Sequence, residues 1–419
     1  MALKVLQGNL QAGQTSVPDL PANEVPIDGV VEFRDTNHPN LPPLRVPKAT
    51  VFVNERGRNI TVGFFGPGPL PTVFPPRDSR ISVVLPRWHI QPHRDNVPED
   101  RVDQPFRAGF PQQPQTGTSV TFKTSLCGLD TYQVSHFGIE PEPFIFIEVR
   151  KRIRCQYFEM DRPNPLPAPE GPTFNELRPH LQRARDFFAD NFGIDLTFSQ
   201  DAIQPDRTLS LQPPRTQNQL DTMLPPQNQR QPRELFILAV RRITPPEVGW
   251  GGRSMAAVSI QNWLDELQSN RQWVAGFAQF QRQQGRIGGE NDFLNQQGVQ
   301  DPGVRRFLLQ LLRGLTTPES VFNKGLFSTL LHEIGHALGL VPTNEMAGGM
   351  DQSPWRDGAH QNHCNTDSCV MWWEAELAQQ GFQLRIGEET PFDHSMDLPT
   401  RCTLYLFACD LSDIRHFPQ

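Results

Sequence analysis

A proline-rich segment, Asp161–Pro172, divides the sequence into two parts whose apolar residues follow different patterns. Such a run continues neither a helix nor an inner strand, because proline fixes φ and lacks a backbone N–H group. Strand-sized apolar runs precede the segment, whereas helical and strand-like stretches alternate after it. We therefore expect one domain over residues 1–160, a linker over 161–172 and a second domain over 173–419.

Short strand-like runs between turn signals fill the first part. They occupy Val30–Phe33, Ala49–Val53, Asn59–Phe65, Arg80–Leu85, Ser119–Thr124 and Phe144–Arg152. Ala49–Phe65 is expected to form a hairpin that turns at Glu55–Arg58, where Gly57 supplies a positive φ. Several strands at this spacing predict an all-β domain, either sandwich-like or an open barrel. The pattern identifies no partner for this domain.

The second part is predicted to combine helices and strands. Apolar residues at helical spacing cover Thr173–Phe192, Trp263–Gln284 and Val304–Leu315. Strands are expected at Ile194–Ser199 and Glu234–Ile243, and Gly249–Ile260 is interpreted as a glycine loop that leads into a further strand. The whole chain is therefore expected to have an α+β fold.

One predicted helix begins and ends with strong signals. Thr317 is a good N-cap residue, Pro318 suits the first helical position, and Glu319 is favourable near the positive end of the helix dipole. Gly339 is suited to end the helix in the left-handed conformation. We therefore predict a well-capped apolar helix from Thr317 to about Gly339.

This helix carries the motif HExxH, formed by His332, Glu333 and His336. Residues four apart lie one turn above each other, so both imidazoles project from one face towards a common point. Two neutral imidazoles on a rigid helix make half of a tetrahedral zinc site. The intervening glutamate is placed to take a proton from a water that zinc has acidified. The motif therefore predicts a catalytic Zn²⁺ ion.

The sequence HEIGHALGL resembles the opening of the metzincin zinc-binding motif, HExxHxxGxxH. Gly339 matches the glycine of that motif, but Pro342 stands where the third histidine belongs. After an insertion over Val341–Gln361 comes HCNTDSCVM, which resembles the H-C-x4-C-x-M block of the archaemetzincins. The resemblance covers roughly Thr173 to the C-terminus and implies a metzincin-like mixed α/β catalytic domain that hydrolyses peptide bonds.

The resemblance implies a role for each matching residue. His332, His336 and His363 would bind the catalytic zinc, Glu333 would be the general base, and Met371 would form the turn beneath the metal. It also implies a second, structural zinc bound by four cysteines, for which the sequence offers Cys364, Cys369, Cys402 and Cys409. The last two are spaced C-x6-C, which departs from the CxxC of the family. Disulfides or buried thiols stay open as alternatives for these cysteines.

In metzincins an edge strand above the zinc-binding helix pairs with an extended peptide substrate. Ser254–Ile260 is the best candidate for that strand, and Gly251 and Gly252 before it permit close approach of a backbone. The substrate-binding residues expected on this basis are Ser254, Met255, Ala256, Ala257 and Val258.

Other assignments stay open from the sequence. His360 and His394 compete with His363 as the third ligand. In a gluzincin-type peptidase, Glu374 or Glu376 would take that place from a following helix. A non-catalytic, zinc-stabilised binding protein, with the β domain as its working part, is a further alternative.

The charge balance excludes some partners. The formal net charge is −7, which argues against nucleic-acid binding.

No run approaches the ~20 apolar residues of a membrane helix, so no membrane span is expected. Met1–Pro18 has no basic segment followed by an apolar one, so we expect no Sec signal peptide. A cytoplasmic location is the default expectation, and non-classical export stays open.

Overall fold

The computed structural model divides the chain into two compact units, which are described separately. The first comprises Met1–Arg152, Phe188–Asp195 and Thr403–Ser412, and the second comprises Ile153–Phe187, Leu196–Cys402 and Asp413–Gln419. The structure describes residues 2–7, 24–33, 44–52, 54, 59–65, 80–84, 115–116, 119–123, 130–137, 144–159, 177–204, 219–220, 224–240, 242–243, 247–285, 287–341, 346–347, 350–351, 357–358, 363–365, 369–371 and 411–417. The expected linker, 161–172, lies outside these residues.

Strands dominate the described part of the first unit. They are β1 (Ala2–Gln7), β2 (Glu24–Val25), β3 (Ile27–Phe33), β4 (Leu44–Phe52), β5 (Asn59–Phe65), β6 (Arg80–Val84), β7 (Gln115–Thr116), β8 (Ser119–Lys123), β9 (Asp130–Phe137) and the first part of β10 (Phe144–Glu159). One sheet has the order β2-β1-β5-β8, and β3, β4, β10, β9, β6 and β7 are joined in sequence in another. The strand expected at Asn59–Phe65 is thereby confirmed, and the one expected at Arg80–Leu85 is confirmed as far as Val84.

The hairpin expected over Ala49–Phe65 is wrong. β4 pairs with β3 and, in parallel, with β10, whereas β5 pairs with β1 and β8 in the other sheet. The apolar runs therefore predicted the strands but not their partners. Pairing is decided by packing against neighbouring strands, which a local turn signal does not specify.

The second unit is built on a mixed sheet. Its strands are the last part of β10, β12 (Glu234–Val240), β14 (Met255–Ser259) and β13 (Gly249–Gly252), paired in that order, and β11 (Ile194–Gln204) also pairs with β10. β10, β12 and β14 run parallel, and β13 is antiparallel to β14. Every residue of β12 is buried, as expected for an inner strand covered on both faces.

The segment Gly249–Ile260 is a hairpin rather than a glycine loop before a strand. β13 and β14 are joined by Arg253 and Ser254, which both have positive φ, 44° and 61°. A two-residue turn with positive φ at both positions matches the right-handed twist of the strands it connects. Because β14 is flanked by β12 and β13, Ser254–Ile260 is not an edge strand, and that prediction is corrected.

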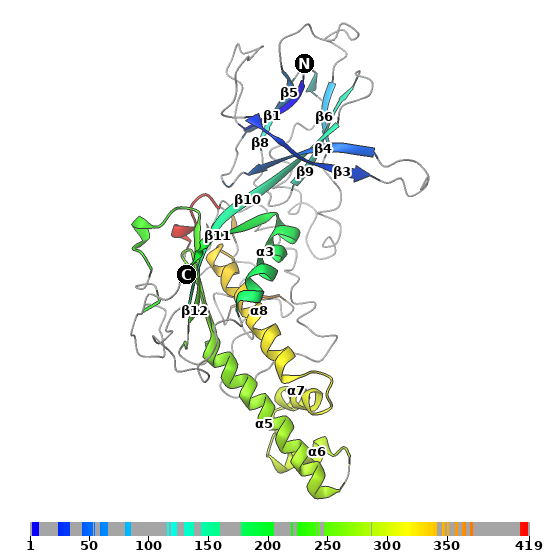
Figure 1. Ribbon diagram of the computed structural model, residues 1–419, viewed down its shortest axis with the longest axis vertical. Helices are drawn as coiled ribbons and strands as arrows, with labels where there is room; N and C mark the ends of the chain where they lie inside the picture. Colours follow the sequence, from blue (N-terminus) through cyan, green and yellow to red (C-terminus); the bar gives the residue numbers. More distant parts are fainter. Residues whose placement is uncertain are drawn as a thin grey trace. The chain divides into compact units, whose positions relative to one another are not determined.

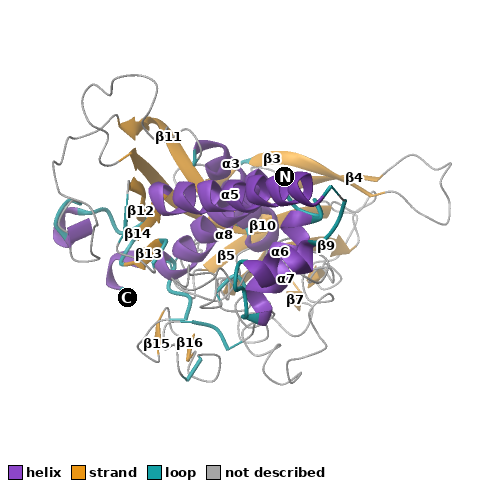
Figure 2. Cartoon of the chain, turned by 90° about the horizontal axis from the view of Figure 1, so that it is seen from below, coloured by secondary structure: helices purple, strands orange, loops and turns teal. Residues whose placement is uncertain are grey.

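Helices pack on this sheet and on one another. The described residues contain α3 (Arg178–Phe192), α5 (Ile260–Gln284), α6 (Glu290–Gln296), α7 (Pro302–Leu312) and α8 (Pro318–Ala337). α8 contacts β13 and β14, and α5 runs alongside α8 (Figures 1 and 2). Strands and helices together give the expected mixture of α and β structure. None of the described helices combines the length and the apolar character of a membrane span.

The capping signals of α8 are confirmed. Thr317 Oγ1 accepts a hydrogen bond from Ser320 N at 3.1 Å, Pro318 is the first helical residue, and Gly339 follows the helix end with φ of 85°. The helix is buried almost throughout its second half. An enclosed, capped helix holds its side chains in fixed directions, which matters for the histidines near its end.

His180 on α3 packs against α8 and should make stability depend on pH. Its ring stacks on Phe327 with centroids 5.8 Å apart, and Arg183 donates a hydrogen bond to its Nδ1. Burial, and then the charge of Arg183, lowers the pKa of His180 from 6.5 to about 4. Between these pH values the unfolded chain takes up a proton that the folded chain does not, so stability present above pH 6.5 is lost as the pH falls.

We expect this loss to reach at most about 3 kcal/mol at pH 4, at about 1.4 kcal/mol per pKa unit. His180→Phe keeps an aromatic ring against Phe327 but cannot titrate. Urea midpoints of both proteins between pH 4 and pH 7.5 measure the effect, since the other histidines cancel in the difference. If the urea midpoints of wild type and variant changed with pH in the same way, this prediction would be wrong.

Candidate metal centre

The predicted metal-binding histidines come together at the end of α8. His332 and His336 lie one helical turn apart, and the ring of His363 lies 5.3 Å from that of His332 and 5.6 Å from that of His336. Among the described residues, one ligand atom from each of the three lies within 4.8 Å of the others. The third histidine was expected only from a displaced motif, and the structure brings it to the helical pair.

The hydrogen bonds of the two helical histidines determine which ring nitrogen carries the proton. Nδ1 of His332 is 2.7 Å from the carbonyl oxygen of Val370, and Nδ1 of His336 is 3.2 Å from that of Leu340. A carbonyl oxygen only accepts hydrogen bonds, so each Nδ1 must be the donor. In the neutral tautomer so assigned, each Nε2 bears a lone pair.

These two lone pairs face each other. The Nε2 atoms of His332 and His336 are 3.0 Å apart. Two acceptors at this distance repel each other unless a cation lies between them. For a tetrahedral Zn²⁺ ion with Zn–N bonds of about 2.0–2.1 Å, two ligand nitrogens would be about 3.3 Å apart. The residues present therefore fit a metal ion of this kind, and backbone carbonyls that hold the opposite nitrogen are typical of metal-binding histidines.

The surroundings also favour the uncharged form that a metal requires. Burial lowers the pKa of His336 well below 6.5, and repulsion by the neighbouring His332 and His363 lowers it further. His336 therefore offers a lone pair at neutral pH. His332 is only 3% exposed.

Met371, the expected turn methionine, packs against α8. It is fully buried, and its carbonyl oxygen accepts a hydrogen bond from Cys364 N at 2.8 Å. A Cβ atom added to Gly335 would stand 2.5 Å from its sulfur. Gly335 lies between the two histidines on α8, so its missing side chain is what lets Met371 approach the helix there.

Glu333 lies against the edge of the sheet. It is 5% exposed, and a Cβ atom on Gly249 of β13 would overlap its Oε1 atom. A Cβ atom on Gly251 would overlap the backbone carbonyl oxygen of Glu333 and stand 2.8 Å from Cβ of His336. Residues two apart in a strand share a face, so the two glycines let β13 pass close over the end of α8.

β13, and not the predicted Ser254–Ile260, is therefore the strand beside the metal site. Among the described strands only β14 pairs with it, so its other edge has no described strand partner. Gly249 was missed as a site residue, although the alternation of glycines in the sequence GWGG is the signal that could have found it. Of the residues expected to bind substrate, Met255–Val258 are buried in β14 and Ser254 is buried in the turn before it.

The remaining sequence candidates are only partly described. Cys364 and Cys369 are both buried, and Cys369 Sγ accepts a hydrogen bond from Met371 N at 3.3 Å. Their supposed partners in a second zinc site, Cys402 and Cys409, lie outside the described residues. So do the rival third ligands His360, Glu374, Glu376 and His394.

No protein-family model matches the sequence, and no curated protein matches it significantly. What remains is three histidines in contact around one point, a buried glutamate beside them and a strand edge that passes over the same helical turn. Together these form a candidate metal centre.

Proposed function

We propose that the chain is a zinc-dependent metallopeptidase with a metzincin-like catalytic domain over residues 173–419 and a sandwich-like accessory domain over 1–160. The observation that carries the proposal is the pair of inward-facing Nε2 lone pairs, 3.0 Å apart, with Glu333 next in sequence to His332. His332, His336 and His363 would hold the ion. Three protein nitrogens leave a fourth position for water or substrate, which is the ligand set of a catalytic zinc site.

When bound, zinc lowers the pKa of a coordinated water to about 7 and polarises a carbonyl group. Glu333 accepts the proton of the attacking water and later passes it to the leaving amine. Its burial against Gly249 keeps the carboxylate in place for both transfers.

The strand β13 supports a peptide as the substrate. An extended peptide can add to a strand edge through main-chain hydrogen bonds, which fix the position of its backbone carbonyls. β13 passes over the turn of α8 that carries Glu333 and His336. A peptide paired with β13 would therefore run past the residues that carry out hydrolysis.

Metal content and peptide cleavage test the proposal together. Protein purified without added zinc is expected to contain at least one zinc ion per chain by elemental analysis, and two if the four cysteines hold a second ion. It should cleave members of a peptide library, detected by mass spectrometry, and a chelator should stop cleavage until zinc is restored.

The outcomes separate the alternatives. Zinc without cleavage of any peptide would favour the non-catalytic, zinc-stabilised binding protein. Protein that holds no zinc and takes up none when zinc is added would contradict both. The Glu374 or Glu376 alternative needs a ligand substitution, which is argued below.

A further inference from the structure

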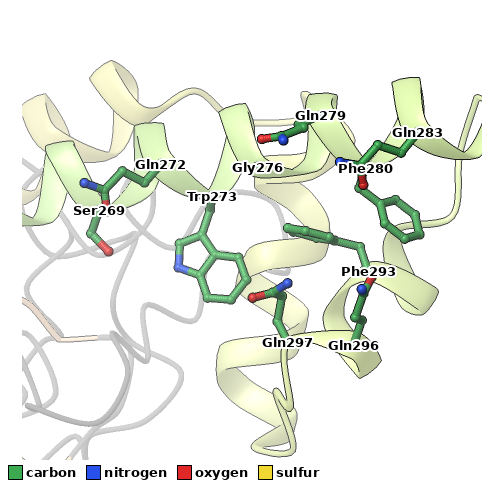
Figure 3. Close-up of a pocket in the computed structure, with 10 residues that line it drawn as sticks. All are labelled: Ser269, Gln272, Trp273, Gly276, Gln279, Phe280, Gln283, Phe293, Gln296 and Gln297. Atoms are coloured by element: carbon green, nitrogen blue, oxygen red, sulfur yellow. The ribbon is translucent and has the colours of Figure 1, made fainter.

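A second site lies on the helices α5 and α6. They line a cavity of about 470 Å³ that is open to solvent, and its five glutamines are exposed (Figure 3). This volume lies within the range of small-molecule binding sites. The lining residues are Ser269, Gln272, Trp273, Gly276, Gln279, Phe280, Gln283, Phe293, Gln296 and Gln297. None belongs to α8 or β13, so the cavity is separate from the candidate metal centre.

The lining is polar but carries no formal charge. Five of its ten described residues are glutamines and one is a serine. A glutamine amide offers two donor hydrogens and an acceptor oxygen, and a serine hydroxyl both donates and accepts. Phosphates, carboxylates and ammonium groups would find no counter-charge here, whereas hydroxyl groups would find a partner for both their donor and acceptor functions.

Aromatic rings form the rest of the wall. The ring of Phe293 is in contact with Phe280, with centroids 5.5 Å apart, and meets Trp273 edge to face at 5.9 Å and 85°. The indole of Trp273 points from α5 into the space near Gln297 (Figure 3). Trp273 is only half-buried, so part of its indole can meet an apolar surface of a ligand.

Gly276 keeps the cavity open. It lies within the 25-residue helix α5, where glycine is less favourable than alanine. A Cβ at this position would be 3.4 Å from Phe293, at the wall of the cavity. Alanine would therefore fit, but a longer side chain would enter the space between Trp273 and Phe280.

We propose that this cavity binds a neutral carbohydrate. A sugar ring combines vicinal hydroxyl groups, which suit the amides, with an apolar C–H face, which suits the indole. An ionic ligand would lose hydration without gaining an opposite charge from the lining. The proposal goes beyond the peptidase function and does not depend on it.

Isothermal titration of the full-length protein tests the site. The probes are maltotetraose, cellotetraose, chitotetraose, mannotetraose and galactotetraose, with decaproline as a peptide probe. At least one sugar is expected to show saturable binding. Gly276→Met should weaken that binding at least about tenfold, equivalent to about 1.4 kcal/mol, because methionine fills the cavity while favouring the helix.

Two controls keep the interpretation clear. Ala278→Met places the same side chain on an exposed position of α5 outside the lining and should leave sugar binding unchanged. Gly276→Ala changes helix propensity without filling the space. Circular dichroism of each variant checks that α5 is retained. No saturable binding to any of the sugars would overturn the proposal, as would sugar binding that Gly276→Met leaves intact or binding of decaproline alone.

Discussion

Glu333→Gln is expected to lower kcat for peptide cleavage by about 10²–10⁴-fold, the usual contribution of a general base. Glutamine has nearly the same shape and fits the same buried position against Gly249. It cannot accept the proton of the attacking water or return it to the leaving amine. Zinc should stay bound, because His332, His336 and His363 are unchanged.

The measurements are kcat for a peptide that the wild type cleaves and zinc content by elemental analysis of the same sample. Glu319→Gln is the matched control, since it makes the same change on the same helix at an exposed residue. It removes the ion pair of Glu319 with Arg271 at 2.9 Å, which at this exposure contributes little. If Glu333→Gln kept full activity, the proposed mechanism would be wrong.

The helix that carries the site could be predicted closely from the sequence. Thr317, Pro318 and Gly339 act through local backbone geometry, so the capping hydrogen bond and the left-handed residue follow from residue type. The spacing of His332 and His336 follows from the helical repeat in the same way. Features that depend on only three or four neighbouring residues could therefore be predicted correctly.

Features that depend on distant segments could not be derived in this way. The predicted hairpin over Ala49–Phe65 failed because β4 and β5 find partners in different sheets. β13 was interpreted as a loop because glycine disfavours strands, although its glycines are needed where α8 lies against it. The short helix α6 was missed because seven residues hold too few turns to show a periodic pattern.

The role of His363 could be predicted from the sequence only through a resemblance. Local geometry does not bring it to α8, and only the resemblance of HCNTDSCVM to the archaemetzincin block pointed to it. The structure adds contacts that the motif does not contain. The carbonyl of Val370 holds His332, and Met371 fills the space left by Gly335. The block thus orients the helical histidines as well as supplying one of its own.

His363→Ala should therefore weaken zinc binding by more than about 100-fold, since loss of an outer hydrogen bond to a ligand alone costs 10–100-fold. The helical pair would remain as half a site, and Val370 would still hold His332. Competition with a chromogenic chelator measures the zinc affinity. Thermal unfolding with and without that chelator shows whether the variant still folds.

Glu374→Gln and Glu376→Gln are the matched variants, because each removes one of the rival ligands while keeping the size of the side chain. If His363 is the third ligand, both should bind zinc as tightly as the wild type. Retention of tight zinc binding by His363→Ala, together with its loss in one glutamate variant, would instead assign the gluzincin-type site. The three nitrogens within 4.8 Å of one another favour the first result, because three imidazoles around one point are the ligand set of a catalytic zinc site.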